Sequence, residues 1–187
     1  MDKIANPIET FRLRILLMYG ATHEQVCIHE AGHRFFWKLV FPEIRTRYAV
    51  RNGLPLVERV DGNAKVKAKN LSREEASRWI YVKLGGIAAE MLTMGLEADA
   101  DEIARWVASD YLDNSHCLDW GDDSAHGGDL SQAITIIVAQ TNRDSLAKNL
   151  SGFLQSCISN IRGNAADFWE EVSEARKAFG NAKLVDL

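Results

Sequence analysis

The segment from Val26 to Phe36 constrains the fold of this chain more than any other, because it combines an apolar helix pattern with two nearby histidines. Its sequence is VCIHEAGHRFF, in which His33 follows His29 by four positions and Glu30 stands directly after the first histidine. Residues four apart lie on the same face of an α-helix, so both imidazoles can point at one spot. We therefore predict a helix whose histidine face binds a divalent metal ion.

The residue types in this motif suit hydrolysis at a zinc ion. Neutral imidazole is a good zinc ligand, and a catalytic zinc keeps three protein ligands and one open position for water. Glu30 is turned by about 100° from His29 around the helix, so it can reach such a water without ligating the metal. The motif predicts hydrolysis, with a coincidental pattern on a helix surface as the alternative, and a third ligand is needed to decide between them.

Length and composition are typical of one globular domain. The chain has 187 residues and a mass of 20.9 kDa, with 47% hydrophobic and 26% charged residues, which is enough to bury a core. A net charge of −4 and the lack of a basic cluster argue against nucleic-acid binding. We find no apolar run that could span a bilayer and no signal-peptide pattern, so we expect a cytoplasmic protein. The three cysteines are widely spaced without a C-x-x-C pair, so a Cys-rich zinc finger is not indicated.

Hydrophobic periodicity and capping signals predict a mainly α-helical fold with a small antiparallel β segment at about residues 45–69. Two capping-box patterns, Thr22 with Gln25 and Ser72 with Glu75, mark the beginnings of the motif helix and of a second long helix. The expected helices cover residues 8–19, 23–40, 73–94, 101–112, 129–139, 145–161 and 165–179. Two or three strands are expected, within 48–50, 56–60 and 64–68, separated by Asn-Gly and Asp-Gly turns.

Three further features bear on a metal site. Gly85 and Gly86 lie inside a predicted helix, where glycine costs stability, which suggests that another backbone approaches closely there. Glu90 lies on the same apolar helix and needs a partner. Asp129 falls in the first residues of a buried helix, where the helix dipole stabilises a negative charge. It is either a preorganised ligand or an ordinary helix cap.

The histidines outside the motif carry weaker signals. His23 lies in the first turn of the motif helix and is expected to be an exposed polar residue. His116, Cys117 and His126 lie in the stretch 97–129, which holds ten acidic residues and one basic residue. We expect a solvated acidic loop around them. A second metal site is the alternative, although these residues match no standard ligand spacing.

Three segments, in this order, resemble the peptidase domain of the FtsH-type ATP-dependent zinc proteases. They are His29-Glu30-Ala31-Gly32-His33, then Leu84-Gly85-Gly86-Ile87-Ala88-Ala89-Glu90, then Gly128-Asp129-Leu130 with Ala133 one turn later. A small β-rich segment lies between the first two, as in that family. The resemblance covers about residues 22–162 of a single domain spanning 1–187, with a C-terminal helix in 163–187.

The resemblance implies a helical, zincin-like zinc endopeptidase that acts on flexible or unfolded polypeptides. Carried over to this chain, His29, His33 and Asp129 hold one Zn²⁺ per chain, and Glu30 is the general base. Glu90 either orients a ligand histidine from behind or is itself the third ligand. The FtsH proteins form hexameric rings, so a homo-oligomer is an open alternative to a monomer.

The chain departs from that family in ways that bear on activity. It has no G-x-x-x-x-G-K-[ST] loop and no membrane segment, so we expect it to act without ATP hydrolysis. Arg34 replaces the small residue expected after the second histidine, residues 126–128 replace the usual polar lead-in to Asp129, and the acidic stretch after Gly95 resembles an insertion. The alternative function is therefore a catalytically inactive binding or regulatory module with the same fold.

Overall fold

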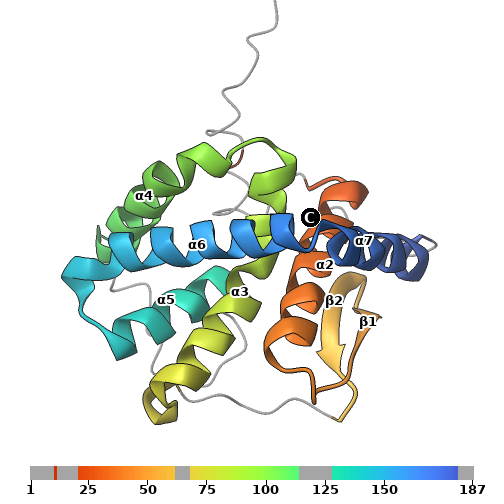
Figure 1. The fold of residues 1–187 in the computed structure, drawn as a ribbon, viewed down its shortest axis with the longest axis horizontal. Helices are drawn as coiled ribbons and strands as arrows, with labels where there is room; N and C mark the ends of the chain where they lie inside the picture. Colours follow the sequence, from red (N-terminus) through yellow and green to blue (C-terminus); the bar gives the residue numbers. More distant parts are fainter. Residues whose placement is uncertain (1–10, 12–20, 62–67, 114–127, 181–187) are drawn as a thin grey trace, which may run out of the picture.

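The structure, a computed structural model, describes residues 11, 21–61, 68–113 and 128–180. Within these ranges the chain is mainly helical, with one two-stranded antiparallel sheet (Figure 1). The α-helices are α2 (His23–Val40), α3 (Arg73–Thr93), α4 (Ala100–Asp113), α5 (Asp129–Gln140), α6 (Leu146–Gly163) and α7 (Ala165–Phe179). The strands are β1 (Thr46–Arg51) and β2 (Leu54–Arg59), and the short 3-10 turns are η1 (Ala68–Asn70), η2 (Glu97–Asp99) and η3 (Arg143–Ser145).

Local capping interactions set the beginnings of the two central helices. The side chain of Thr22 accepts a hydrogen bond from the backbone N–H of Gln25, whose side chain accepts one from the N–H of Thr22. Ser72 and Glu75 form the same reciprocal pair at the start of α3. Both predicted capping boxes are therefore confirmed. After α3, Gly95 has a φ of +71°, a conformation that favours glycine and stops the helix.

The small β segment is a hairpin that follows α2. Its two-residue turn, Asn52-Gly53, has φ values of 55° and 79°, as expected where both turn residues must adopt a left-handed conformation. The first two predicted strands are confirmed in slightly shifted form, with Tyr48 opposite Val57 in the register. The third predicted strand lies largely outside the described residues, as does the predicted helix 8–19, of which only Phe11 is described, as a buried helical residue.

The core is built around α2 and α3, which pack directly against each other (Figure 1). Their closest approach is at Gly32 and Gly85, where a Cβ on Gly32 would lie 2.2 Å from the backbone oxygen of Gly85. This contact confirms the close backbone approach predicted from the glycine pair in α3. The hairpin and α7 cover one side of α2, while α5 and α6 cover α3 and α4 packs on α6.

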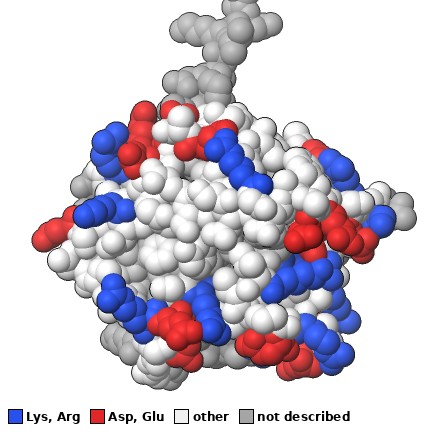
Figure 2. Space-filling model, viewed as in Figure 1, with Lys and Arg blue, Asp and Glu red and all other residues white. Residues whose placement is uncertain are grey.

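The surface mixes both signs of charge. On the face shown in Figure 2, acidic and basic side chains alternate around the rim and leave the centre largely uncharged. This face therefore offers no extended basic surface of the kind that nucleic-acid binding requires. Among the helices within the described ranges, none has both the length and the hydrophobicity to cross a membrane.

Candidate metal centre

The two motif histidines lie one turn apart on α2 and face α3. Their Nε2 atoms are 2.9 Å apart, and the rings meet edge to face with centroids 4.6 Å apart. His33 is buried, with 5% of its surface exposed, whereas the side chain of His29 is 27% exposed. The pair therefore forms a cluster that is closed on the side of His33 and open to solvent on the side of His29.

The outer nitrogen of each ring is held by α3. Nδ1 of His33 donates a hydrogen bond to the backbone oxygen of Val82, at 2.7 Å, and Nδ1 of His29 contacts the Glu90 carboxylate. Because a backbone carbonyl only accepts, Nδ1 of His33 must carry a proton. These contacts fix both rings with Nε2 pointing inward, which is how ligand histidines are oriented in metal sites.

Glu90 therefore stands behind His29 rather than beside it. Its side chain is almost fully buried, with 4% of its surface exposed. Of the two roles implied by the resemblance, orientation of His29 matches the contact with Nδ1. A direct ligand role would require the carboxylate to leave this nitrogen and turn toward the inner face of the ring.

Asp129 reaches the histidines from the first residue of α5. Its Oδ2 atom lies 3.1 Å from Nε2 of His33, and its Oδ1 atom accepts a hydrogen bond from Nζ of Lys83 at 2.8 Å. The structure thus links His29 to His33 and His33 to Asp129. Among the described residues, the compact group in which one ligand atom of each residue lies within 4.8 Å of the others is His29, Glu30 and His33, and it does not include Asp129. Sequence reasoning did not single out Lys83, because a lysine on a helix is ordinarily a solvated residue.

The electrostatics of the site couple His33 to Asp129. Burial, the largest single effect, favours neutral His33, but the charge and hydrogen bond of Asp129, together with the charge of Glu30 and the hydrogen bond to Val82, outweigh it and raise the pKa of His33 to about 9. The partial burial of Asp129 likewise opposes its ionisation, yet the charges of His33 and Lys83 hold its pKa well below the ordinary value. Without a metal ion, His33 therefore carries a proton on Nε2 at neutral pH and donates it to Asp129.

The inner nitrogens of the two histidines fit a zinc ion. If both histidines were neutral with protons on Nδ1, the lone pairs on their Nε2 atoms would face each other at 2.9 Å and repel, so a proton or a cation must lie on this face. Two nitrogens on a tetrahedral zinc, each at about 2.0–2.1 Å, lie about 3.4 Å apart. The two Nε2 atoms, now 2.9 Å apart, would need to separate by about 0.5 Å. Nitrogen donors with one carboxylate are typical zinc ligands.

Glu30, the residue after His29 on α2, lies beside the histidine pair. One of its carboxylate oxygens is within 4.8 Å of a ligand nitrogen of both His29 and His33. Its Oε2 atom accepts a hydrogen bond from the backbone N–H of Val57 on β2, at 2.9 Å. Burial, reinforced by the charge of Asp129, raises the pKa of Glu30 to about 7, against the opposing effects of His33 and the Val57 amide. A carboxylate with such a pKa can exchange a proton near neutral pH.

Gly86 provides the space that the His29 ring occupies. A Cβ built on Gly86 would lie 2.6–2.7 Å from three atoms of that ring, including Nε2. Gly85 allows α2 and α3 to pack closely, and Gly86 leaves room for the side chain of His29. The two adjacent glycines of α3 therefore have different roles, which the sequence alone did not separate.

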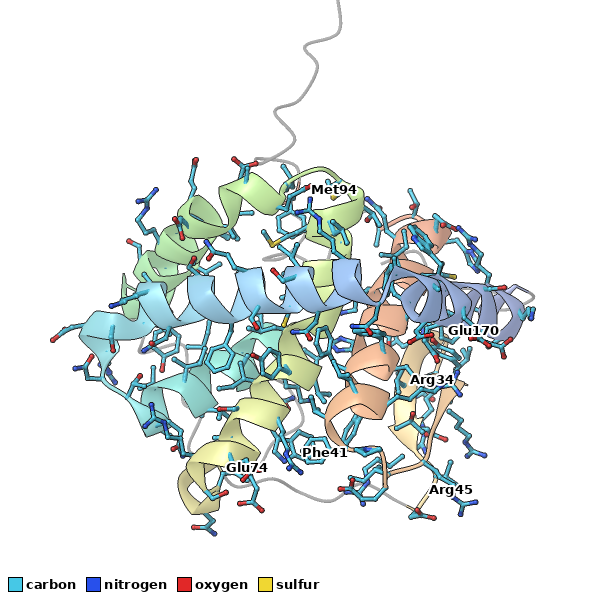
Figure 3. The ribbon with its side chains drawn as sticks, in the orientation of Figure 1. Arg34, Phe41, Arg45, Glu74, Met94 and Glu170 are labelled. Carbon is cyan, nitrogen blue, oxygen red and sulfur yellow. The ribbon has the colours of Figure 1, made fainter. Side chains whose placement is uncertain are left out.

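Arg34 does not cover the site. It extends from α2 toward α7 and the hairpin (Figure 3), where Nη1 lies 3.0 Å from Oε2 of Glu171 and the guanidinium lies over the ring of Tyr48. Glu171 is buried and also accepts from the Tyr48 hydroxyl and contacts Lys38. Sequence reasoning found no chemistry in α7 and missed this network, because its partners lie more than a hundred positions apart.

His23, the other candidate ligand within the described residues, does not join the pair formed by His29 and His33. His23 is exposed, as predicted, and its Nε2 atom lies 3.3 Å from the backbone oxygen of Phe179. The second metal site considered for His116, Cys117 and His126 lies outside the described residues. No family model matches the chain, and no curated protein or solved structure matches it.

Proposed function

We propose that this protein is a zinc metallopeptidase that hydrolyses flexible or unfolded polypeptides without ATP. The observation that carries the proposal is the inward convergence of the Nε2 atoms of His29 and His33, each ring held from behind, with a carboxylate oxygen of Glu30 beside them. Asp129 supplies the third ligand in this proposal. The sequence resemblance to FtsH-type peptidases agrees with this assignment of roles.

A zinc ion held by these three residues would lower the pKa of a water molecule to about 7 and polarise the scissile carbonyl. Glu30 takes the proton of the attacking water. Its Oε2 atom is held by the Val57 amide, so Oε1 is the oxygen left to receive that proton. As the peptide bond breaks, the same carboxylic acid returns the proton to the leaving amine nitrogen.

The outer edge of β2 is the proposed position of the substrate backbone. The N–H of Val57 points away from β1 and reaches Glu30, so this edge passes directly beside the general base. Because the Val57 N–H is bonded to Glu30 and Pro55 has no N–H, an extended peptide can add to this edge mainly by donating its own N–H groups to the outward carbonyl oxygens of β2, which would place a peptide bond near the histidine cluster. A flexible or unfolded segment can present an extended backbone of this kind.

The proposal is tested by metal analysis and by a single substitution. We expect about one zinc per wild-type chain in tag-free protein, and much less in Asp129→Ala. Glu30→Gln should retain the metal and lower hydrolysis of a fluorescein-labelled, chemically unfolded protein by at least about 100-fold. Wild-type cleavage by Glu30→Gln would contradict the role of the base.

A catalytically inactive binding or regulatory module is the second candidate function. It is favoured by the direct contact between His33 and Asp129 at 3.1 Å, in which a proton satisfies the site without a metal. A wild-type protein that takes up no zinc when zinc is supplied in excess would support this module and refute the peptidase.

A further inference from the structure

Lys83 links the metal centre to α5 through a direct ionic hydrogen bond. Its Nζ atom donates to Oδ1 of Asp129 at 2.8 Å, and its side chain is 20% exposed. The residue before it, Val82, accepts the hydrogen bond from Nδ1 of His33. Two consecutive residues of α3 therefore hold two of the proposed zinc ligands, one through the backbone and one through a side chain.

The two oxygens of Asp129 have different partners. Oδ2 faces Nε2 of His33, and Oδ1 faces Lys83. If Nε2 of His33 gives its lone pair to a metal ion, it can no longer donate a proton to Oδ2, so that contact is lost. The contact with Lys83 does not involve the inner face of the site and can persist in both states.

We propose that Lys83 is the positioning residue for Asp129, holding Oδ1 so that Oδ2 stays directed at the metal site. This inference rests on the proposed metal centre. The exposed fraction of the Asp129 side chain is 35%, so solvent and rotation would otherwise compete for the carboxylate. The charge of a lysine does not favour metal binding at this site, because its ammonium group repels a divalent cation. What Lys83 supplies is the orientation of the ligand.

A purely structural role for Lys83 makes a different prediction. In that case the ion pair would only tether α5 to α3, and its loss would lower the stability of the protein without a specific effect on the metal. At its other end, α5 is also connected to the segment just before α3, where the side-chain amide of Gln140 donates to the backbone oxygen of Leu71. Removal of the lysine should therefore leave α5 docked.

The test is a double-substitution cycle on zinc affinity. Zinc dissociation constants are measured by competition with a chromogenic chelator for the wild type, Lys83→Met, Asp129→Ala and the double variant. Lys83→Met should weaken zinc binding by about 10- to 100-fold, the range typical for residues that orient a metal ligand. In the Asp129→Ala background, the same substitution should have no further effect.

Two control variants separate loss of the donor from replacement of the side chain as such and from general loss of an ion pair. Lys83→Arg keeps a cationic donor and should bind zinc within a few-fold of the wild type. Lys38→Met removes a lysine that contacts the buried Glu171 on the opposite side of α2, and it should leave zinc affinity unchanged. Circular dichroism and urea unfolding of each variant establish that it is folded at the assay temperature. If Lys83→Met fails to fold, Lys83→Ala, which also removes the donor, takes its place in the cycle.

The outcomes distinguish this inference from the metal centre itself. Wild-type zinc affinity in the folded Lys83 variant, beside weak binding in Asp129→Ala, overturns the role of Lys83 and leaves the ligand set intact. Lower stability of the Lys83 variant with unchanged affinity also overturns it, because that is the result of a simple tether. Wild-type affinity in Asp129→Ala refutes the proposed ligand set.

Discussion

Gly86→Ala should weaken zinc binding strongly while leaving the fold intact. The added Cβ would lie 2.6 Å from Nε2 of His29 and 2.7 Å from two carbons of the ring. The atoms it meets belong to the end of a side chain and not to a backbone. The His29 ring can therefore rotate away from the new methyl group, but it must leave the inner face of the site to do so.

The expected loss of affinity follows from the size of this displacement. Ordinary van der Waals contact begins at 3.4 Å, so the ring atoms must move by roughly 0.8 Å from their 2.6 Å positions. Zinc–ligand distances tolerate about 0.2 Å of variation. The ring is also held by Glu90 on one side and by His33 on the other, so it cannot shift and still reach the same point. We expect zinc affinity to fall by at least about 100-fold, or about 2.7 kcal/mol.

The effect of Gly86→Ala on stability should be small. Alanine is favoured over glycine inside a helix by about 1 kcal/mol. A strained or altered His29 rotamer costs about 0.5–1.5 kcal/mol. The two contributions oppose each other, so the free energy of unfolding of the metal-free protein should change by no more than about 1 kcal/mol. Urea unfolding measures this quantity, and chelator competition measures the zinc affinity of the same sample.

Gly152→Ala is the matched control. Gly152 lies inside α6, and a Cβ at this position would meet nothing within 4 Å. This variant should gain up to about 1 kcal/mol of stability and bind zinc as the wild type does. Wild-type zinc affinity in Gly86→Ala would refute the reasoning, because it would show that the ligand position of His29 does not depend on the space above Gly86.

Three further predictions concern packing, the buried network and the proton at the site. Gly32→Ala should prevent folding or lower the free energy of unfolding, measured in urea, by several kcal/mol. Its Cβ would lie 2.2 Å from the backbone oxygen of Gly85, and a backbone atom cannot rotate away. Cooperative unfolding with wild-type stability would contradict this. Glu171→Ala should lower the free energy of unfolding by about 3 kcal/mol without loss of zinc, because it leaves the largely buried Arg34 guanidinium without its carboxylate partner. A change below about 1 kcal/mol would contradict this, because it would show that water replaces the lost carboxylate. Zinc binding at pH 7.5 should release a proton from His33, because the pKa of this side chain is raised to about 9. The apparent zinc affinity should therefore increase as the pH rises toward 9. Calorimetry in two buffers of different ionisation enthalpy measures the number of protons released, and a value of zero would contradict the prediction.

The helices were predictable because their signals are local. Capping boxes at Thr22 and Ser72 and the stop at Gly95 depend on residues within one turn, and the structure places the helix ends within one or two residues of the predicted positions. The strand limits were less well predicted, since the hairpin extends through Thr46 and Leu54, whose pairing depends on the partner strand rather than on alternation alone.

The parts of the site that the sequence did not reveal depend on contacts between distant segments. Lys83 and Asp129 are 46 positions apart, and nothing in the pattern of α3 distinguishes this lysine from a solvated one. Glu171 likewise reads as a surface residue of an amphipathic helix, although the structure buries it against α2. Periodicity shows which face of a helix is apolar, but it does not show which charged residue at the edge of that face will meet a partner.

The helix crossing itself is part of the proposed site. Gly32 lies between the two histidines and allows α3 to approach α2 at backbone distance. At this separation, residues of α3 spaced four apart, which share one face, all reach the imidazoles: Val82 binds His33, Gly86 accommodates the His29 ring, and Glu90 binds its Nδ1 atom. A wider crossing would break these three contacts together. Gly32 and Gly86 thus set the ring positions as directly as the histidines set the donor chemistry. A chain with the histidine motif but without these two glycines should not orient its rings in this way.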